Sequence, residues 1–162
     1  MKQSGIRDFR RNLRRFERLN QLVNTACCAG ITLAQCHVLL EIENQTETST
    51  KQLSGILCLD KSTLSRTIDG LKKQGFIKRG SDSHDRRFTI VSLTRKGIDK
   101  CRSLNRYNDN LYIELFERFS QEDRDLFLRL FGEMVLAFSE YCQEKNLCCS
   151  NVQTECCEDC SD

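Results

Sequence analysis

The chain contains 162 residues and no proline. Proline breaks the interior of a helix because it has no backbone N–H and its ring clashes with the preceding turn. Long helices are therefore permitted almost everywhere, and apolar residues recur at the three- and four-residue steps of amphipathic helices. We predict a mainly α fold of a size that suits one ordinary domain.

Local capping signals predict where the helices begin and end. Ser, Thr and Asp side chains accept hydrogen bonds from a first turn, and glycine ends a helix with left-handed backbone angles. The predicted helices cover residues 6 to 30, 32 through 40, 50 through 57, 61 to about 74, 94 to about 119, and 120 through 138. Their predicted caps are Thr32, Ser49 or Thr50, Asp60, Thr94 and Ser120, with stops at Gly30 and Gly75. An aromatic and methionine stripe on the last helix suits a core or dimer contact better than a ligand pocket: Phe127, Phe131, Met134 and Phe138.

Two strands are predicted after the fourth helix. Residues 76–79 and 87–93 read as strands, the second rich in β-branched and aromatic residues, and residues 80–85 are turn-forming. They predict a β-hairpin. A short helix, a turn, a longer helix and a hairpin follow one another in the order of a winged helix-turn-helix.

The net charge of +2 hides an uneven distribution. Residues 1–18 carry seven Lys/Arg against two acids, and residues 51–100 carry twelve against five. The last twenty residues carry five acids and one lysine. Clustered basic charge suits a phosphate backbone, although a solvated basic face explains the charge equally well.

The predicted helix over residues 61–74 has two distinct faces. Leu64, Ile68 and Leu71 form its inward stripe, and its outward side chains can enter a major groove: Ser62, Ser65, Arg66, Asp69 and Lys73. Ser62 and Thr63 lie at the positive helix N-terminus, where amides and hydroxyls can hold a phosphate. Arg66 is long enough to reach a base edge, and Lys61 and Lys73 suit the DNA backbone.

The stretch from Thr32 to Gly97 resembles the MarR family of bacterial regulators. The residues that carry the resemblance are Asp60-Lys61-Ser62-Thr63-Leu64-Ser65-Arg66, Leu71-Lys72-Lys73-Gln74-Gly75-Phe76-Ile77, Asp85-Arg86-Arg87, Val91-Ser92-Leu93-Thr94 and Gly97. The resemblance implies a repressor that binds a palindromic operator as a homodimer built from the first and last two helices. It also implies that the hairpin tips enter the minor groove, with Arg86 or Arg87 as the contact and Asp85 orienting Arg87 by an ion pair. A surface ion pair by itself contributes under ~1 kcal/mol, so the basic hairpin is the reason for naming these residues.

Eleven cysteines are too many to be core fillers alone in a chain of this size. A first candidate metal group is Cys27, Cys28, Cys36 and His37, which the corner between the first two helices brings together. Such ligands suit zinc, and a mostly thiolate set also suits cadmium or trivalent arsenic. Against this, adjacent Cys27 and Cys28 point about 100° apart on a helix, and His37 lies on an apolar stripe. Cys58 and Cys101 are predicted to be small core residues.

A second candidate group lies in an acidic tail over residues 146–162, which we separate from the domain over residues 1–145. Its thiols are Cys148, Cys149, Cys156, Cys157 and Cys160. With little apolar content besides cysteine, the tail can fold only around a ligand such as zinc, another soft metal or an iron-sulfur cluster. In the dimer that the resemblance implies, the tail can cover the Cys27 corner.

These observations predict a DNA-binding transcriptional regulator, not an enzyme. No paired-carboxylate site, phosphate-binding glycine loop or serine triad is evident, and Cys157-Cys160 lacks the βαβ setting of a thiol-disulfide oxidoreductase. The leading hypothesis is operator binding switched by a metal, metalloid or cluster on the cysteines. Alternatives are the same dimer switched by thiol oxidation, and a metal-binding or interaction module that never touches DNA. No apolar run approaches the ~20 residues of a membrane span, and the start lacks a secretory signal, which predicts a cytoplasmic protein.

Overall fold

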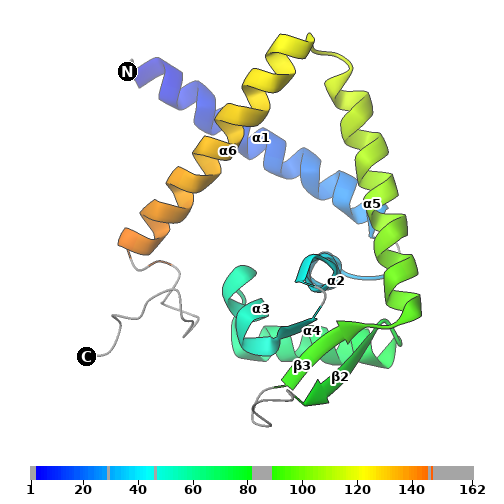
Figure 1. The fold of residues 1–162 in the computed structure, drawn as a ribbon. Coiled ribbons are helices and arrows are strands. Elements are labelled where there is room, and N and C mark those ends of the chain that lie inside the picture. The colour runs from blue at the N-terminus through cyan, green and yellow to red at the C-terminus, as the bar shows by residue number, and fades with distance from the viewer. Residues whose placement is uncertain (1–2, 29, 46, 82–88, 146, 148–162) are drawn as a thin grey trace.

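The computed structural model describes residues 3–28, 30–45, 47–81, 89–145 and 147. Within them the helices are α1 (Gln3–Cys27), α2 (Leu33–Gln45), α3 (Thr50–Ile56), α4 (Lys61–Lys73), α5 (Arg95–Phe116) and α6 (Gln121–Glu144). The strands are β1 (Glu47–Ser49), β2 (Ile77–Ser81) and β3 (Thr89–Leu93). The predicted mainly α, winged helix-turn-helix fold is confirmed (Figure 1).

The predicted caps form as hydrogen bonds. Thr32 and Gln35 make a capping box, in which the Gln35 N–H donates to Thr32 Oγ1 (3.2 Å) and the Thr32 N–H donates to Gln35 Oε1 (3.0 Å). Ser49, Asp60, Thr94 and Ser120 cap the four later helices. The predicted stops Gly30 and Gly75 have φ of +84° and +76°, which other residues rarely adopt.

The sheet has a third strand that the sequence did not predict. Its order is β1-β3-β2, and both pairs are antiparallel, with Thr48 and Arg79 on opposite sides of Val91. β1 is only three residues long, too short for an alternating pattern to reveal it. It forms because the chain leaving α2 reaches the open edge of β3, so the backbone groups of both gain partners.

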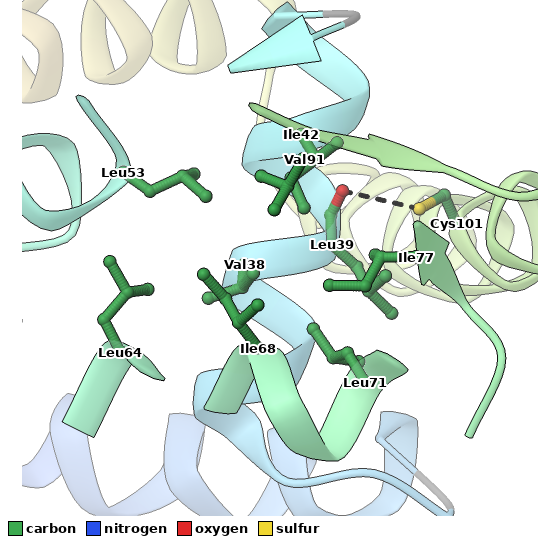
Figure 2. Close-up of a cluster of buried hydrophobic side chains, with 10 residues drawn as sticks. All are labelled: Val38, Leu39, Ile42, Leu53, Leu64, Ile68, Leu71, Ile77, Val91 and Cys101. Atoms are coloured by element: carbon green, nitrogen blue, oxygen red, sulfur yellow. Dashed lines mark hydrogen bonds between the residues drawn. The ribbon is translucent and has the colours of Figure 1, made fainter. Parts of the chain in front are cut away.

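The hydrophobic core lies where α2, α3, α4, α5 and the sheet meet (Figure 2). The predicted inward stripe of α4, Leu64, Ile68 and Leu71, is buried there against Val38 and Leu39 of α2. Cys101 of α5 is fully buried, as predicted, and its thiol donates to the Leu39 carbonyl (3.6 Å). This core fixes the orientation of α4.

The prediction that Cys58 is a core residue is wrong. α3 ends at Ile56, and Cys58 lies in the following turn with φ of +48° and an exposed side chain. The helical stripe that would have buried Cys58 therefore stops before reaching it.

Helices α1, α5 and α6 extend away from this core (Figure 1). α5 leads out from the sheet and α6 returns, and no residue of α6 is buried. Three residues of the predicted aromatic stripe are about half exposed: Phe127 (51%), Phe131 (44%) and Phe138 (54%). No helix in the described part of the chain is long and apolar enough to cross a membrane.

Candidate nucleic-acid interface

Helix α4 presents a row of polar and basic side chains to solvent. Exposed on it are Lys61, Ser62, Ser65, Arg66 and Lys73, and Thr63 is half-buried at the first turn. All six were predicted from the sequence, and their exposure follows from the burial of Leu64, Ile68 and Leu71 on the other side. The face is therefore accessible to a partner as large as a DNA duplex.

A chain of hydrogen bonds holds Arg66 against its own helix. Arg66 donates from Nε to the Ser62 carbonyl (3.2 Å) and from Nη2 to Ser62 Oγ (3.4 Å). Ser62 in turn donates to Asp60 Oδ1 (2.6 Å). Arg66 is thereby oriented before any ligand binds, which reduces the entropy lost on binding.

Asp60 has a second role that the sequence reasoning missed. It accepts from the Thr63 N–H (2.9 Å) as well as from Ser62. These hydrogen bonds, of which the one from Ser62 has the largest effect, hold the pKa of Asp60 well below its usual range. Asp60 is therefore ionised at neutral pH. Because Asp60 occupies the Thr63 amide and the Ser62 hydroxyl proton, a phosphate there must displace it or use other donors.

A groove next to this face adds two basic residues that were not singled out from the sequence. It has a volume of about 560 Å³ and lies between α3, α4 and the sheet, with Lys51, Lys61 and Arg79 among its lining residues. Asp69 of α4, which was predicted to face outward, forms an ion pair with Arg79 of β2 (2.7 Å). The ion pair links α4 to the hairpin. In the sequence, only the alternation of side chains along β2 indicates that Arg79 could face α4.

The comparisons with known proteins agree with this geometry. Residues 31–89 match the family model described as MarR family. Over these residues the chain is similar to the MarR family. Its relatives include the HTH-type transcriptional regulator SarZ of Staphylococcus haemolyticus, 30% identical over 97 residues that span 59% of this chain and 63% of SarZ. This confirms the predicted class, a DNA-binding transcriptional regulator and not an enzyme.

Solved structures show the same fold. A crystal structure of MarR has a TM-score of 0.71 at 23% identity and covers 89% of this chain and 95% of that one. Streptococcus pneumoniae FabT, solved in complex with DNA, has a TM-score of 0.71 at 18% identity, with coverage of 82% and 97%. At these identities the likeness extends to the fold, and the residues that contact DNA must be argued from this chain.

Other predicted site residues fall outside the described residues. They include the hairpin residues Asp85, Arg86 and Arg87 and the tail thiols Cys148, Cys149, Cys156, Cys157 and Cys160. Their roles stay predictions, as does the division of the chain at residue 145.

The first cysteine group is only partly brought together. Cys28 and Cys36 are buried in one small cluster with Leu104, whereas His37 is exposed. The side chain of Cys27 lies outside the described part. Among the described residues, no three His, Cys, Asp or Glu side chains gather where they could hold a metal ion. A four-ligand zinc site at this corner therefore needs ligands from elsewhere, such as the tail or a second chain.

Proposed function

We propose that this chain binds palindromic operator DNA as a homodimer and represses transcription, with α4 in the major groove and the hairpin tip in the minor groove. The observation that carries the proposal is Arg66, exposed on α4 and oriented by Ser62. An arginine in this position can donate two hydrogen bonds to a guanine edge. Lys61, Lys73 and the groove residue Lys51 supply charge for phosphates.

The exposed apolar surface supports the homodimer. α1, α5 and α6 all expose large apolar side chains, among them Phe16 (52%), Leu22 (69%), Ile113 (59%) and Leu136 (64%). A monomeric protein rarely exposes contiguous apolar patches larger than a few hundred Å². A dimer joined through these helices would place two α4 helices on one side of a duplex, and half-sites must then lie about 34–36 Å apart.

Replacing Arg66 by alanine is expected to weaken specific DNA binding about 5- to 150-fold, since one base-reading arginine contributes about 1–3 kcal/mol. A randomised duplex library selected on the full chain supplies the target sequence. Fluorescence anisotropy on that duplex and on a scrambled one then gives the affinity and the specificity. The specificity should fall with the affinity, because Arg66 is proposed to read a base and not only a phosphate.

The matched control is Arg118→Ala. Arg118 is 70% exposed and lies just after α5, whose end is remote from α4 (Figure 1). Its loss removes the same charge at a site away from the proposed DNA-binding face. Equal DNA affinities of Arg66→Ala and the wild type would instead favour the alternative hypothesis, a metal-binding or interaction module that never touches DNA.

The cysteines are the proposed switch of this regulator. The leading form is a soft metal, a metalloid or an iron-sulfur cluster bound by thiols, and the alternative is thiol oxidation. Support comes from the thiol content, from the burial of Cys28 and Cys36 together, and from the position of Cys36 in α2, which packs on α4.

The metal, arsenic and sulfide content of protein purified without oxygen or chelators tests this switch. Near-stoichiometric metal or a cluster absorbance, with DNA affinity that changes when it is removed, would support the leading form. An empty protein whose DNA binding responds to a peroxide and recovers with a reductant would support oxidation. DNA affinity that ignores metals, metalloids and oxidants alike would end the proposal of a cysteine switch.

A further inference from the structure

Two thiols at the corner between α1 and α2 lie together in an apolar environment. Cys28 follows the last residue of α1, Cys36 is in the first turns of α2, and both pack with Leu104 of α5. Their exposed fractions are 5% and 4%. Local hydrogen bonds hold the corner, since the Cys28 carbonyl accepts from the Ile31 N–H (2.9 Å) and the Cys36 N–H donates to the Thr32 carbonyl (2.9 Å). Both thiols therefore project from ordered backbone.

A hollow of about 260 Å³ leads to Cys28. It is lined by residues of α1 and of the α1–α2 corner, with Cys28 among them: Gln21, Asn24, Cys28, Ile31, Thr32 and Leu33. Its volume is just below that of most ligand pockets, which usually measure about 300–1,000 Å³. A compact ligand with one or two small substituents fits this space better than a drug-sized molecule.

The chemistry of the pair limits what can bind. A divalent ion held by two thiolates in an apolar cluster needs further ligands, and an iron-sulfur cluster normally takes four cysteines. A trivalent arsenical needs only two thiols, and its adduct is neutral, so burying it avoids the large cost of burying charge. In the reaction two S–H protons leave with arsenic-bound oxygen as water, two As–S bonds form, and the oxidation state of arsenic does not change.

We propose that Cys28 and Cys36 form a dithiol site for trivalent arsenicals. This deepens the proposed cysteine switch and rests on the proposed function only for its effect on DNA. The site assigns distinct roles to the first cysteine group: Cys28 and Cys36 bind, and His37, exposed on the same helix, does not.

Gln35 connects this site to the DNA-binding helix. It precedes Cys36, its Oε1 accepts from the Thr32 N–H, and its Nε2 lies against α4. A Cβ built on Gly70 of α4 would lie 2.6 Å from that Nε2, so the glycine is what allows this approach. An arsenic bridge would fix the distance between the two sulfurs. The resulting movement of the first turn of α2 would shift Gln35 against α4 and change the position of Arg66.

Phenylarsine oxide is the probe, because its arsenic carries one phenyl group and can bind only two thiols. The reduced full chain is treated without oxygen or added thiols, digested with trypsin and analysed by mass spectrometry. Neither Lys nor Arg occurs between Arg18 and Lys51, so residues 19–51 form one peptide with Cys27, Cys28 and Cys36. The five tail thiols lie in a separate peptide after Lys145.

The expected result is one phenylarsenic group on the 19–51 peptide, with fragmentation that assigns the bridge to Cys28 and Cys36. Cys28→Ala and Cys36→Ala should each lose it, whereas Cys27→Ala and Cys101→Ala should keep it. A bridge between Cys27 and Cys28, or none on this peptide of the wild type, would overturn the site. The wild-type fragmentation decides this even if an alanine variant fails to fold.

The same treatment is expected to change the affinity for the selected duplex at least about 5-fold in the wild type and not in Cys36→Ala. An adduct at Cys28 and Cys36 with unchanged DNA affinity would overturn the connection through Gln35. A chain that forms the adduct but never binds DNA would overturn the proposed function and support the site.

Discussion

Replacing Ile68 by alanine is expected to lower the free energy of unfolding by about 2–5 kcal/mol. Ile68 is fully buried on α4 and packs in the core with residues of α2 and the sheet (Figure 2). The change removes apolar contacts and leaves a cavity that the surrounding helices fill only in part. Such a loss is a large fraction of the 5–15 kcal/mol that holds a typical domain folded. Urea denaturation at a fixed protein concentration measures it.

Ile56→Ala is the matched control for this substitution. Ile56 is the last residue of α3 and is 47% exposed, so the same change there should cost under about 1 kcal/mol. Equal losses at the two positions would contradict the assignment of Ile68 to the core. Because Ile68 also fixes α4 on α2, DNA binding by the Ile68 variant should weaken under conditions where the variant is still folded.

Replacing Gly97 by alanine is expected to lower the free energy of unfolding by about 1–3 kcal/mol, the usual cost of overpacking. Gly97 lies in the first turn of α5, where a Cβ would collide with the Phe76 carbonyl oxygen and lie 3.2 Å from Leu93 Cδ2. The Phe76 carbonyl cannot move freely, since it accepts from the Thr94 N–H (2.9 Å) and from Thr94 Oγ1 (3.1 Å). The clash outweighs the ~1 kcal/mol by which alanine normally favours a helix. Thermal and urea unfolding measure the difference.

Gly5→Ala provides the comparison. Gly5 also lies near the start of a helix, and a Cβ there would meet nothing within 4 Å, so this variant should be as stable as the wild type or slightly more stable. A Gly97 variant that behaves like the Gly5 variant would show that the junction between the hairpin and α5 is looser than described. The close contact also explains physically why a glycine at residue 97 belongs to the pattern that resembles the MarR family.

The cysteine corner shows where periodicity fails as a guide. The sequence placed His37 on an apolar stripe with Leu33 and Leu40, yet His37 is exposed and Cys36 is buried. α2 carries apolar residues on most of its circumference, so several stripes fit its sequence equally well. Packing against α4 and α5 selects the stripe that contains Cys36, Val38, Leu39 and Ile42.

The sequence by itself determined the caps at which the later helices begin and the two faces of α4. Caps such as Asp60 with Thr63 and stops such as Gly75 act within one turn, so their signals are local and readable. The tertiary structure alone decided the addition of β1 to β3, the ion pair between Asp69 and Arg79, and the meeting of Cys28, Cys36 and Leu104. These contacts join separate elements. In the cysteine cluster, for example, Cys28 and Leu104 are 76 positions apart in the sequence. Their partners are chosen by how whole elements pack, and local sequence patterns carry little information about that choice.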